Sequence, residues 1–122
     1  MKRIIISLLS LATIASYANQ QEMFGSIAIS LSTAHYGYSI DQASQGEAES
    51  VAMNACEIQS NYAGDCQALI WFKGDTCGAI AVNSEGDFGA GYGPGHDGAR
   101  KAALDLCHRE GPNCQVIKSM CN

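Results

Sequence analysis

The order of apolar and polar residues predicts two similar strand pairs. Over residues 26–31, isoleucine and leucine alternate with serine and alanine, which is the pattern of a half-buried strand. Residues 80–82 repeat this alternation. Turn-rich segments follow at residues 32–34 and 84–87, so each strand is expected to form a hairpin with the tyrosine- and glycine-bearing segment after it.

Two helices are predicted after these hairpins. Ser44 and Glu47 have the spacing of a capping box, which marks the start of a helix. After it, apolar residues recur at helical spacing and predict one buried face, made of Ala48, Val51, Ala52, Ala55 and Ile58. The matching face of a second helix consists of Ala99, Ala102, Ala103 and Leu106. Because these side chains are mostly small, both helices are expected to lie close to a sheet.

The chain from about residue 24 to its end is an internal repeat. Residues 25–30 match residues 78–83, and apolar segments at 67–72 and 115–117 close the two copies as third strands. Each copy is therefore ββαβ, at about residues 24–74 and 77–122. We expect an α+β fold in which the two repeats form a largely antiparallel sheet with two helices on one face, stapled by disulfides.

The first eighteen residues have the organisation of a secretory signal peptide. Lys2 and Arg3 precede an apolar run over residues 4–14, and small residues at Ser16 and Ala18 suit a signal peptidase. The run is too short for a membrane span, which takes about 20 apolar residues. We expect cleavage after Ala18 and export of residues 19–122 as one domain to the periplasm or the medium, without stable membrane insertion.

Six cysteines lie in the exported part: Cys56, Cys66, Cys77, Cys107, Cys114 and Cys121. An even number in a small exported domain is typical of a disulfide framework, and the absence of C-x-x-C spacing disfavours a zinc site. The repeat gives Cys56–Cys66 and Cys107–Cys114 equivalent places at the end of a helix and the start of a strand. This symmetry favours these two bridges among the possible pairings and leaves Cys77–Cys121 as the third.

The chain has seven basic and twelve acidic residues, a net charge of −5. Without Lys2 and Arg3, five basic residues remain, and the net charge becomes −7. An acidic surface disfavours nucleic acid as a partner and favours a basic protein. The helix and turn patterns place acidic residues toward solvent, among them Glu47, Glu49, Glu85, Asp87 and Asp97.

These features together resemble a family of exported bacterial proteins described as domain of unknown function 4189. The resemblance rests on two G-x-I-A strands, on Trp71-Phe72 at the end of the first copy, and on the glycine-rich segment 89–93. It covers about residues 24–121 and implies a small exported protein. It carries over no catalytic residues. Many members have tryptophan where this chain has Tyr38 and Tyr92.

Catalytic chemistry has weaker support in the sequence. His35, His96 and His108 are candidate general bases, but no G-x-S-x-G elbow accompanies them. Residues 93–98 spell G-x-G-x-x-G, yet the preceding strand is expected in a hairpin rather than in the parallel unit that binds dinucleotides. Residues 83–87 faintly resemble a calcium loop but lack its frame, and a hairpin turn accounts for them. No metal or cofactor is therefore expected.

The sequence favours a non-enzymatic exported binding protein, such as an inhibitor or immunity protein against a toxin or cell-wall hydrolase. Its partner would be a basic envelope or secreted protein. The candidate binding residues are Glu85, Asp87, Asp97, Tyr38 and Tyr92. The alternative is a secreted effector or hydrolase with a site near His35, His96 and Asp97. Aromatic residues on the strands are either core or the lining of a ligand groove, and the core is the commoner outcome.

Overall fold

The computed structural model describes residues 22–122, and the predicted signal peptide (residues 1–18) lies outside the described residues. The strands are β1 (Phe24–Ser30), β2 (Tyr36–Gln42), β3 (Cys66–Lys73), β4 (Thr76–Val82), β5 (Phe88–Pro94) and β6 (Gln115–Cys121). The helices are α2 (Gln45–Gln59) and α3 (Gly95–Glu110). Within residues 22–122, neither helix is long and apolar enough to cross a membrane.

Each repeat forms its own three-stranded antiparallel sheet. The strand orders are β2-β1-β3 and β5-β4-β6, so the first strand of each repeat lies in the centre of its sheet. The helix of the repeat connects one edge strand to the other. This arrangement confirms the α+β class, the two ββαβ repeats and the antiparallel pairing.

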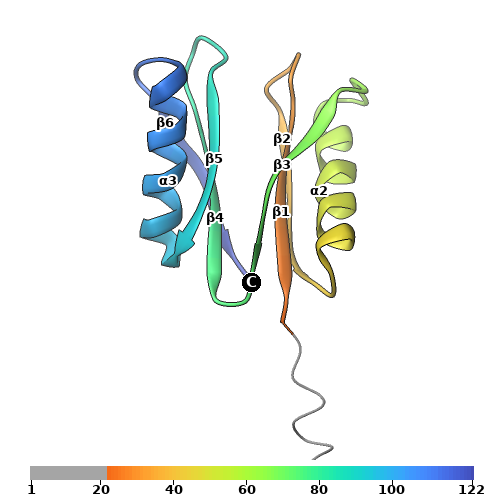
Figure 1. Cartoon of the computed structure of the whole chain (residues 1–122). Coiled ribbons are helices and arrows are strands. Elements are labelled where there is room, and N and C mark those ends of the chain that lie inside the picture. Colours follow the sequence, from red (N-terminus) through yellow and green to blue (C-terminus); the bar gives the residue numbers. More distant parts are fainter. Residues whose placement is uncertain (1–21) are drawn as a thin grey trace, which may run out of the picture.

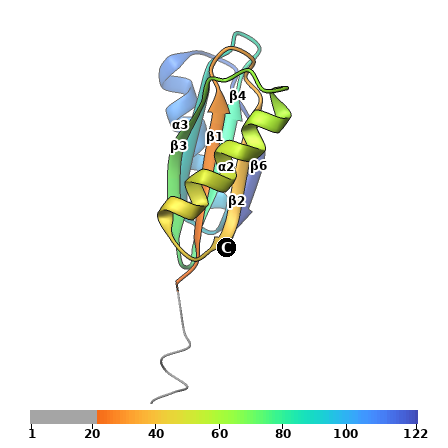
Figure 2. The same ribbon diagram turned by 90° about the vertical axis from the view of Figure 1, so that its right-hand side faces the viewer.

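The two sheets pack face to face, and each helix covers the outer face of its own sheet (Figure 1). The layers follow the order α2, first sheet, second sheet, α3. Figure 2 looks onto α2, with both sheets and α3 behind it. The repeats thus form two sheets where the sequence suggested one, and the helices lie on opposite faces of the molecule rather than on one face.

The central strands explain why two sheets form. Ile27 and Ile29 of β1 pack between the sheets, and Ala28 packs beneath α2. Ser26 and Ser30, which look polar in the sequence, have no exposed surface. Because both faces of β1 are buried, this strand needs a helix on one side and a second sheet on the other. The same holds for β4. Its Ile80 packs between the two sheets, and its Ala79 packs against α3.

Each helix lies so close to its sheet that glycine is required where the second strand of the repeat passes beneath it. A Cβ atom on Gly37 would collide with the backbone of α2 at Cys56, and a Cβ on Gly89 would collide with α3 at Cys107. The two glycines therefore hold equivalent places. The buried face of each helix is narrower than expected and consists of Ala48, Ala52 and Cys56 in α2 and of Ala99, Ala103 and Cys107 in α3.

Several apolar helix residues expected in the core are on the surface instead. Val51 is 42% exposed, Ile58 is 54% exposed and Leu106 is 37% exposed. Close approach of the helix to the sheet leaves room only for residues that point directly at the strands. Larger side chains at the flanks of the face are therefore pushed toward solvent.

The ring of Phe72 is buried in the layer between the sheets. It covers Gly25 in its own sheet and Gly78 in the opposite sheet, and a Cβ atom on Gly78 would lie 2.5 Å from Cε1 of Phe72. Phe72 is 2% exposed. The two glycines are thus needed to admit the ring, and the ring joins the two repeats.

Candidate functional site

All six cysteines form disulfides with the partners predicted from the repeat. The bridges are Cys56–Cys66, Cys107–Cys114 and Cys77–Cys121, with S–S distances of 2.04, 2.02 and 2.00 Å. No free thiol remains in the described residues, which contain every cysteine of the chain. A cysteine nucleophile is therefore excluded in this oxidised state. Three disulfides are typical of proteins in oxidising compartments.

His96 lies at the start of α3, beside the Cys77–Cys121 bridge. Its Nδ1 is 2.7 Å from Oγ of Ser119, and its Nε2 is 3.4 Å from Sγ of Cys121. Asp97 forms an ion pair with Arg100 at 3.2 Å instead of pairing with this imidazole. Within the described residues, no hydrogen bond or ion pair joins His96 to Asp97.

The other two histidines lie elsewhere. His35 belongs to the turn between β1 and β2, which is at the opposite end of the molecule from the start of α3 (Figure 1). Nε2 of His108 accepts a hydrogen bond from the backbone N–H of Cys114 at 3.3 Å, which closes the loop between α3 and β6. The three candidate bases therefore do not form one site.

In the first repeat, the loop between α2 and β3 is held by carboxylates that the sequence patterns do not single out. Glu57 accepts from the backbone N–H groups of Gly64 and Cys66, both at 3.1 Å. Asp65 accepts from Oγ of Ser30 at 2.6 Å and from the backbone N–H of Ser32 at 2.7 Å. These hydrogen bonds, the Ser30 bond first, lower the pKa of Asp65 from its ordinary 3.8. Both carboxylates therefore serve the loop.

The segment 83–87 is a hairpin turn, as expected. Oδ1 of Asn83 accepts from the backbone N–H groups of Glu85 and Asp87 at 3.0 and 2.9 Å, and Nδ2 of Asn83 donates to the Asp87 carboxylate at 2.8 Å. Asp87, a candidate binding residue, is thus engaged in closing the turn, and Glu85 is exposed at its tip. Within residues 22–122, no three metal-ligating side chains gather around a common point.

The G-x-G-x-x-G segment is the junction of β5 with α3. Because β5 pairs antiparallel to β4, the segment is not part of a parallel dinucleotide-binding unit. Gly93 and Gly98 pack against each other, and a Cβ atom on Gly93 would lie 2.9 Å from the carbonyl carbon of Gly98. The glycines therefore serve a tight strand-to-helix turn.

The two candidate tyrosines have different surroundings. Tyr38 of β2 is half-buried, and the ammonium of Lys118 lies 5.4 Å from the centre of its ring. Tyr92 of β5 is 59% exposed. It borders a hollow of about 450 Å³, called the β3 groove below, whose lining is Leu69, Ile70, Trp71, Phe72, Lys73, Thr76 and Tyr92. Trp71 and Tyr92 are groove candidates from the sequence, but the position of this groove is not predictable from it.

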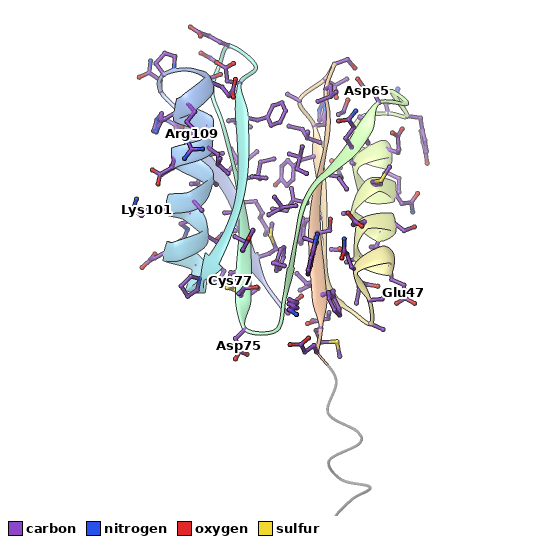
Figure 3. All side chains as sticks on the ribbon, viewed as in Figure 1. Glu47, Asp65, Asp75, Cys77, Lys101 and Arg109 are labelled. Carbon is purple, nitrogen blue, oxygen red and sulfur yellow. A yellow bond between two sulfur atoms is a disulfide. The ribbon has the colours of Figure 1, made fainter. Side chains whose placement is uncertain are left out.

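Charge is divided unevenly between the two helices. α2 contains three glutamates and no basic residue, whereas α3 contains three acidic and three basic residues. Two ion pairs neutralise part of α3, Arg100–Asp97 and Lys101–Asp105. No ion pair involves α2 within residues 22–122. Figure 3 shows Lys101 and Arg109 on α3 and Glu47 on α2, at opposite outer sides of the molecule.

The family comparison agrees with the resemblance seen in the sequence. A family model described as Domain of unknown function (DUF4189) matches residues 24–121. Neither the curated proteins nor the solved structures contain a match. The family match spans both repeats, from the start of β1 to the end of β6, so the family unit includes all six strands and both helices.

Proposed function

Since the chain belongs to the DUF4189 family, whose description names no activity, we propose a function from its surface. The protein is an exported, non-enzymatic binding protein of the periplasm or the medium. It binds a basic protein and, as an inhibitor or immunity protein, blocks a toxin or a cell-wall hydrolase. No lipid, nucleic acid or cofactor is part of this proposal.

The observation that carries the proposal is the unbalanced charge of the first repeat. Residues 22–74 contain six acidic residues and one basic residue, Lys73. Glu47 lies on the outer surface of α2, and no ion pair neutralises it within residues 22–122. Exposed charge of one sign speeds the encounter with a partner of the opposite sign.

The roles of other polar groups add indirect support. Asp65, Glu57, Asp87 and His108 each hold a turn or loop by hydrogen bonds to backbone or side-chain groups. These residues are therefore occupied by folding. The carboxylates of Glu47, which is exposed, and of Glu49, which is half-buried, hold no turn or loop within the described residues.

The test is the association of the processed protein with a partner captured from envelope extract. We expect the association rate to fall steeply as the Debye length shrinks from about 10 Å at 0.1 M salt to about 3 Å at 1 M. The double variant Glu47→Lys/Glu49→Lys should slow association more than Asp105→Lys/Glu110→Lys, which makes the same change of net charge on α3. A rate that is independent of salt, or two variants with equal effects, would overturn the proposal.

One observation favours a second candidate, an esterase-like hydrolase. The hydroxyl of Ser119 and Nδ1 of His96 are 2.7 Å apart, which is the distance of a nucleophile and its general base. Nε2 of His96 faces the disulfide-bonded sulfur of Cys121, so within the described residues the base has no carboxylate to orient it as in a triad. Hydrolysis of a p-nitrophenyl ester that is lost in both Ser119→Ala and His96→Ala would support this candidate and exclude the first.

A further inference from the structure

The outer edge of β3 is open and unusually apolar. β3 is an edge strand in the order β2-β1-β3, so the backbone groups on its outer side have no strand partner within residues 22–122. Residues 68–72 form an unbroken apolar run, and the charged residue of the strand, Lys73, stands at its end. Natural edge strands usually carry charges or proline that prevent pairing with another chain. The middle of β3 has a bulge at Leu69 but no charge or proline, so this edge is available for pairing.

An aromatic-walled hollow follows this open edge. The β3 groove, of about 450 Å³, has residues 69–73 of β3 on one side and Tyr92 of β5 on the other. Tyr92 is 59% exposed and Trp71 is 38% exposed. A strand added to β3 would therefore place alternate side chains against an aromatic wall.

At the equivalent place on the other side of the molecule, side chains bridge the two sheets. There, Lys118 of β6 covers Tyr38 of β2, and the side chain of Asn122 accepts from the backbone N–H of Asp41 at 3.0 Å. Ile27 and Ile80 are equivalent residues of the two central strands. Ile27 pairs with Ile70 and Ile80 pairs with Lys118, so Ile70 is the equivalent of Lys118. On their other sides the same two isoleucines pair with Tyr38 and Ala90, so Ala90 is the equivalent of Tyr38. The β3 side therefore lacks a counterpart of the Lys118–Tyr38 contact within residues 22–122.

Acidic residues stand at both ends of the open edge. Glu57 and Asp65 lie at the start of β3. Their carboxylates accept hydrogen bonds from Cys66 and from the β1–β2 turn, and their negative charge also acts on a chain that lies along this edge. Asp75 follows the end of the strand, and Figure 3 shows Asp65 and Asp75 at opposite ends of the molecule. Lys73, the basic residue on this edge, is paired with Glu22 at 3.8 Å. The charge of the edge thus complements a basic chain.

We propose that the β3 groove binds an extended, basic segment of a partner protein, which adds as a strand to the edge of β3. The backbone of that segment pairs with β3, apolar side chains at alternate positions contact Tyr92 and Leu69, and basic side chains face the acidic ends of the strand. This inference rests on the proposed binding function and names the segment of the partner that is recognised.

A phage library of random peptides, selected against the processed protein with its disulfides intact, tests the proposal. We expect enriched peptides that are net basic and carry apolar residues at alternate positions. A synthetic copy of an enriched peptide should bind about tenfold more weakly to Tyr92→Ala and to Leu69→Ser. In an added strand, every second backbone N–H points toward β3. N-methylation of these amides should abolish binding of the peptide, whereas N-methylation of the other set should leave binding unchanged.

The matched control is Ile117→Ser. Leu69 is the bulged residue of β3, and Ile117 is the bulged residue at the equivalent place in β6. Ile117 is 43% exposed. This variant should bind the peptide as the unchanged protein does, and thermal unfolding shows whether each variant is folded. Failure to enrich peptides, enrichment of acidic ones, or binding unaffected by Tyr92→Ala would overturn the inference.

Two further outcomes separate this inference from its alternatives. If the protein dimerises in sedimentation experiments and Leu69→Ser abolishes the dimer, the occupant is a second copy of the chain, and the proposal fails. If a captured basic partner binds Tyr92→Ala as tightly as the unchanged protein and still shows salt dependence, the groove inference fails while the proposed binding function stands.

Discussion

At the scale of single residues, Asp65 shows how a surface carboxylate can hold two strands together. Its two oxygens bind Oγ of Ser30 at the end of β1 and the backbone N–H of Ser32 in the following turn. Both bonds favour the ionised form, which is why the pKa of Asp65 lies below 3.8 in the folded protein. In the unfolded chain these bonds are absent.

Asp65→Asn should therefore alter the dependence of stability on pH. Because the folded pKa is the lower one, the stabilisation is present above about pH 4 and is lost as the pH falls through the folded pKa. Urea unfolding across this range should show that the free energy of unfolding falls more steeply with decreasing pH for the unchanged protein than for Asp65→Asn. The control Asp75→Asn, on the exposed β3–β4 turn, should keep the steeper pH dependence of the unchanged protein. If Asp65→Asn kept it as well, this role of Asp65 would be contradicted.

Phe72 is the side chain whose removal should cost the most stability. Its ring fills the space left by two glycines in opposite sheets, so its removal opens a cavity between the repeats. Phe72→Ala should lower the free energy of unfolding by about 3–5 kcal/mol, measured by urea unfolding with the disulfides intact. Trp71→Ala, the exposed neighbour, is the control and should have a much smaller effect. A loss of less than about 1 kcal/mol for Phe72→Ala would show that the sheets pack without the ring.

At the scale of elements, the disulfides differ in what they connect. Cys56–Cys66 and Cys107–Cys114 close short loops between a helix and the next strand, with sequence separations of 10 and 7 residues. Cys77–Cys121 joins the paired strands β4 and β6 across a separation of 44 residues. Chain entropy therefore predicts the largest stabilisation from the last bridge.

Replacing Cys77 and Cys121 together by alanine should lower the free energy of unfolding by about 4 kcal/mol. The matched double variant of Cys107 and Cys114 should lose about 2.5 kcal/mol, because its loop is shorter. Urea unfolding of the two double variants measures the difference. Equal losses, or a larger loss for the short loop, would mean that native-state strain outweighs loop entropy in one of the bridges.

The elements themselves could be predicted from the sequence because each rests on local pattern. The alternation in β1 and the cap at Ser44 predict elements that the structure confirms, and the backbone N–H of Glu47 donates to Ser44 Oγ at 3.1 Å. The symmetry of the repeat then predicts the disulfide partners. The exposure of Val51 and Ile58 could not be predicted, since helical spacing alone does not reveal how closely a helix approaches its sheet.

At the scale of the whole molecule, the arrangement of the sheets depends on information that hydropathy does not carry. Alternation with isoleucine predicts that Ser26 and Ser30 face solvent, yet neither has any exposed surface. Small size, not polarity, is what that face of β1 requires. The β3 groove is hidden in the sequence for a related reason, because it is lined by residues of β3, β4 and β5 that come together only when the two sheets pack.

The position of Phe72 has a consequence for how two such repeats can be joined. Gly25 and Gly78 are equivalent residues of the two repeats. Gly25 pairs with Phe72 of β3 and Gly78 pairs with Met120 of β6, so Met120 is the counterpart of Phe72. The ring of Phe72 nevertheless covers both glycines. Two identical copies of the first repeat, assembled as a homodimer, would therefore bring two rings to one space. A single chain with diverged halves avoids this collision. The join between the repeats is therefore asymmetric, since β3 supplies a ring where β6 has a flexible methionine.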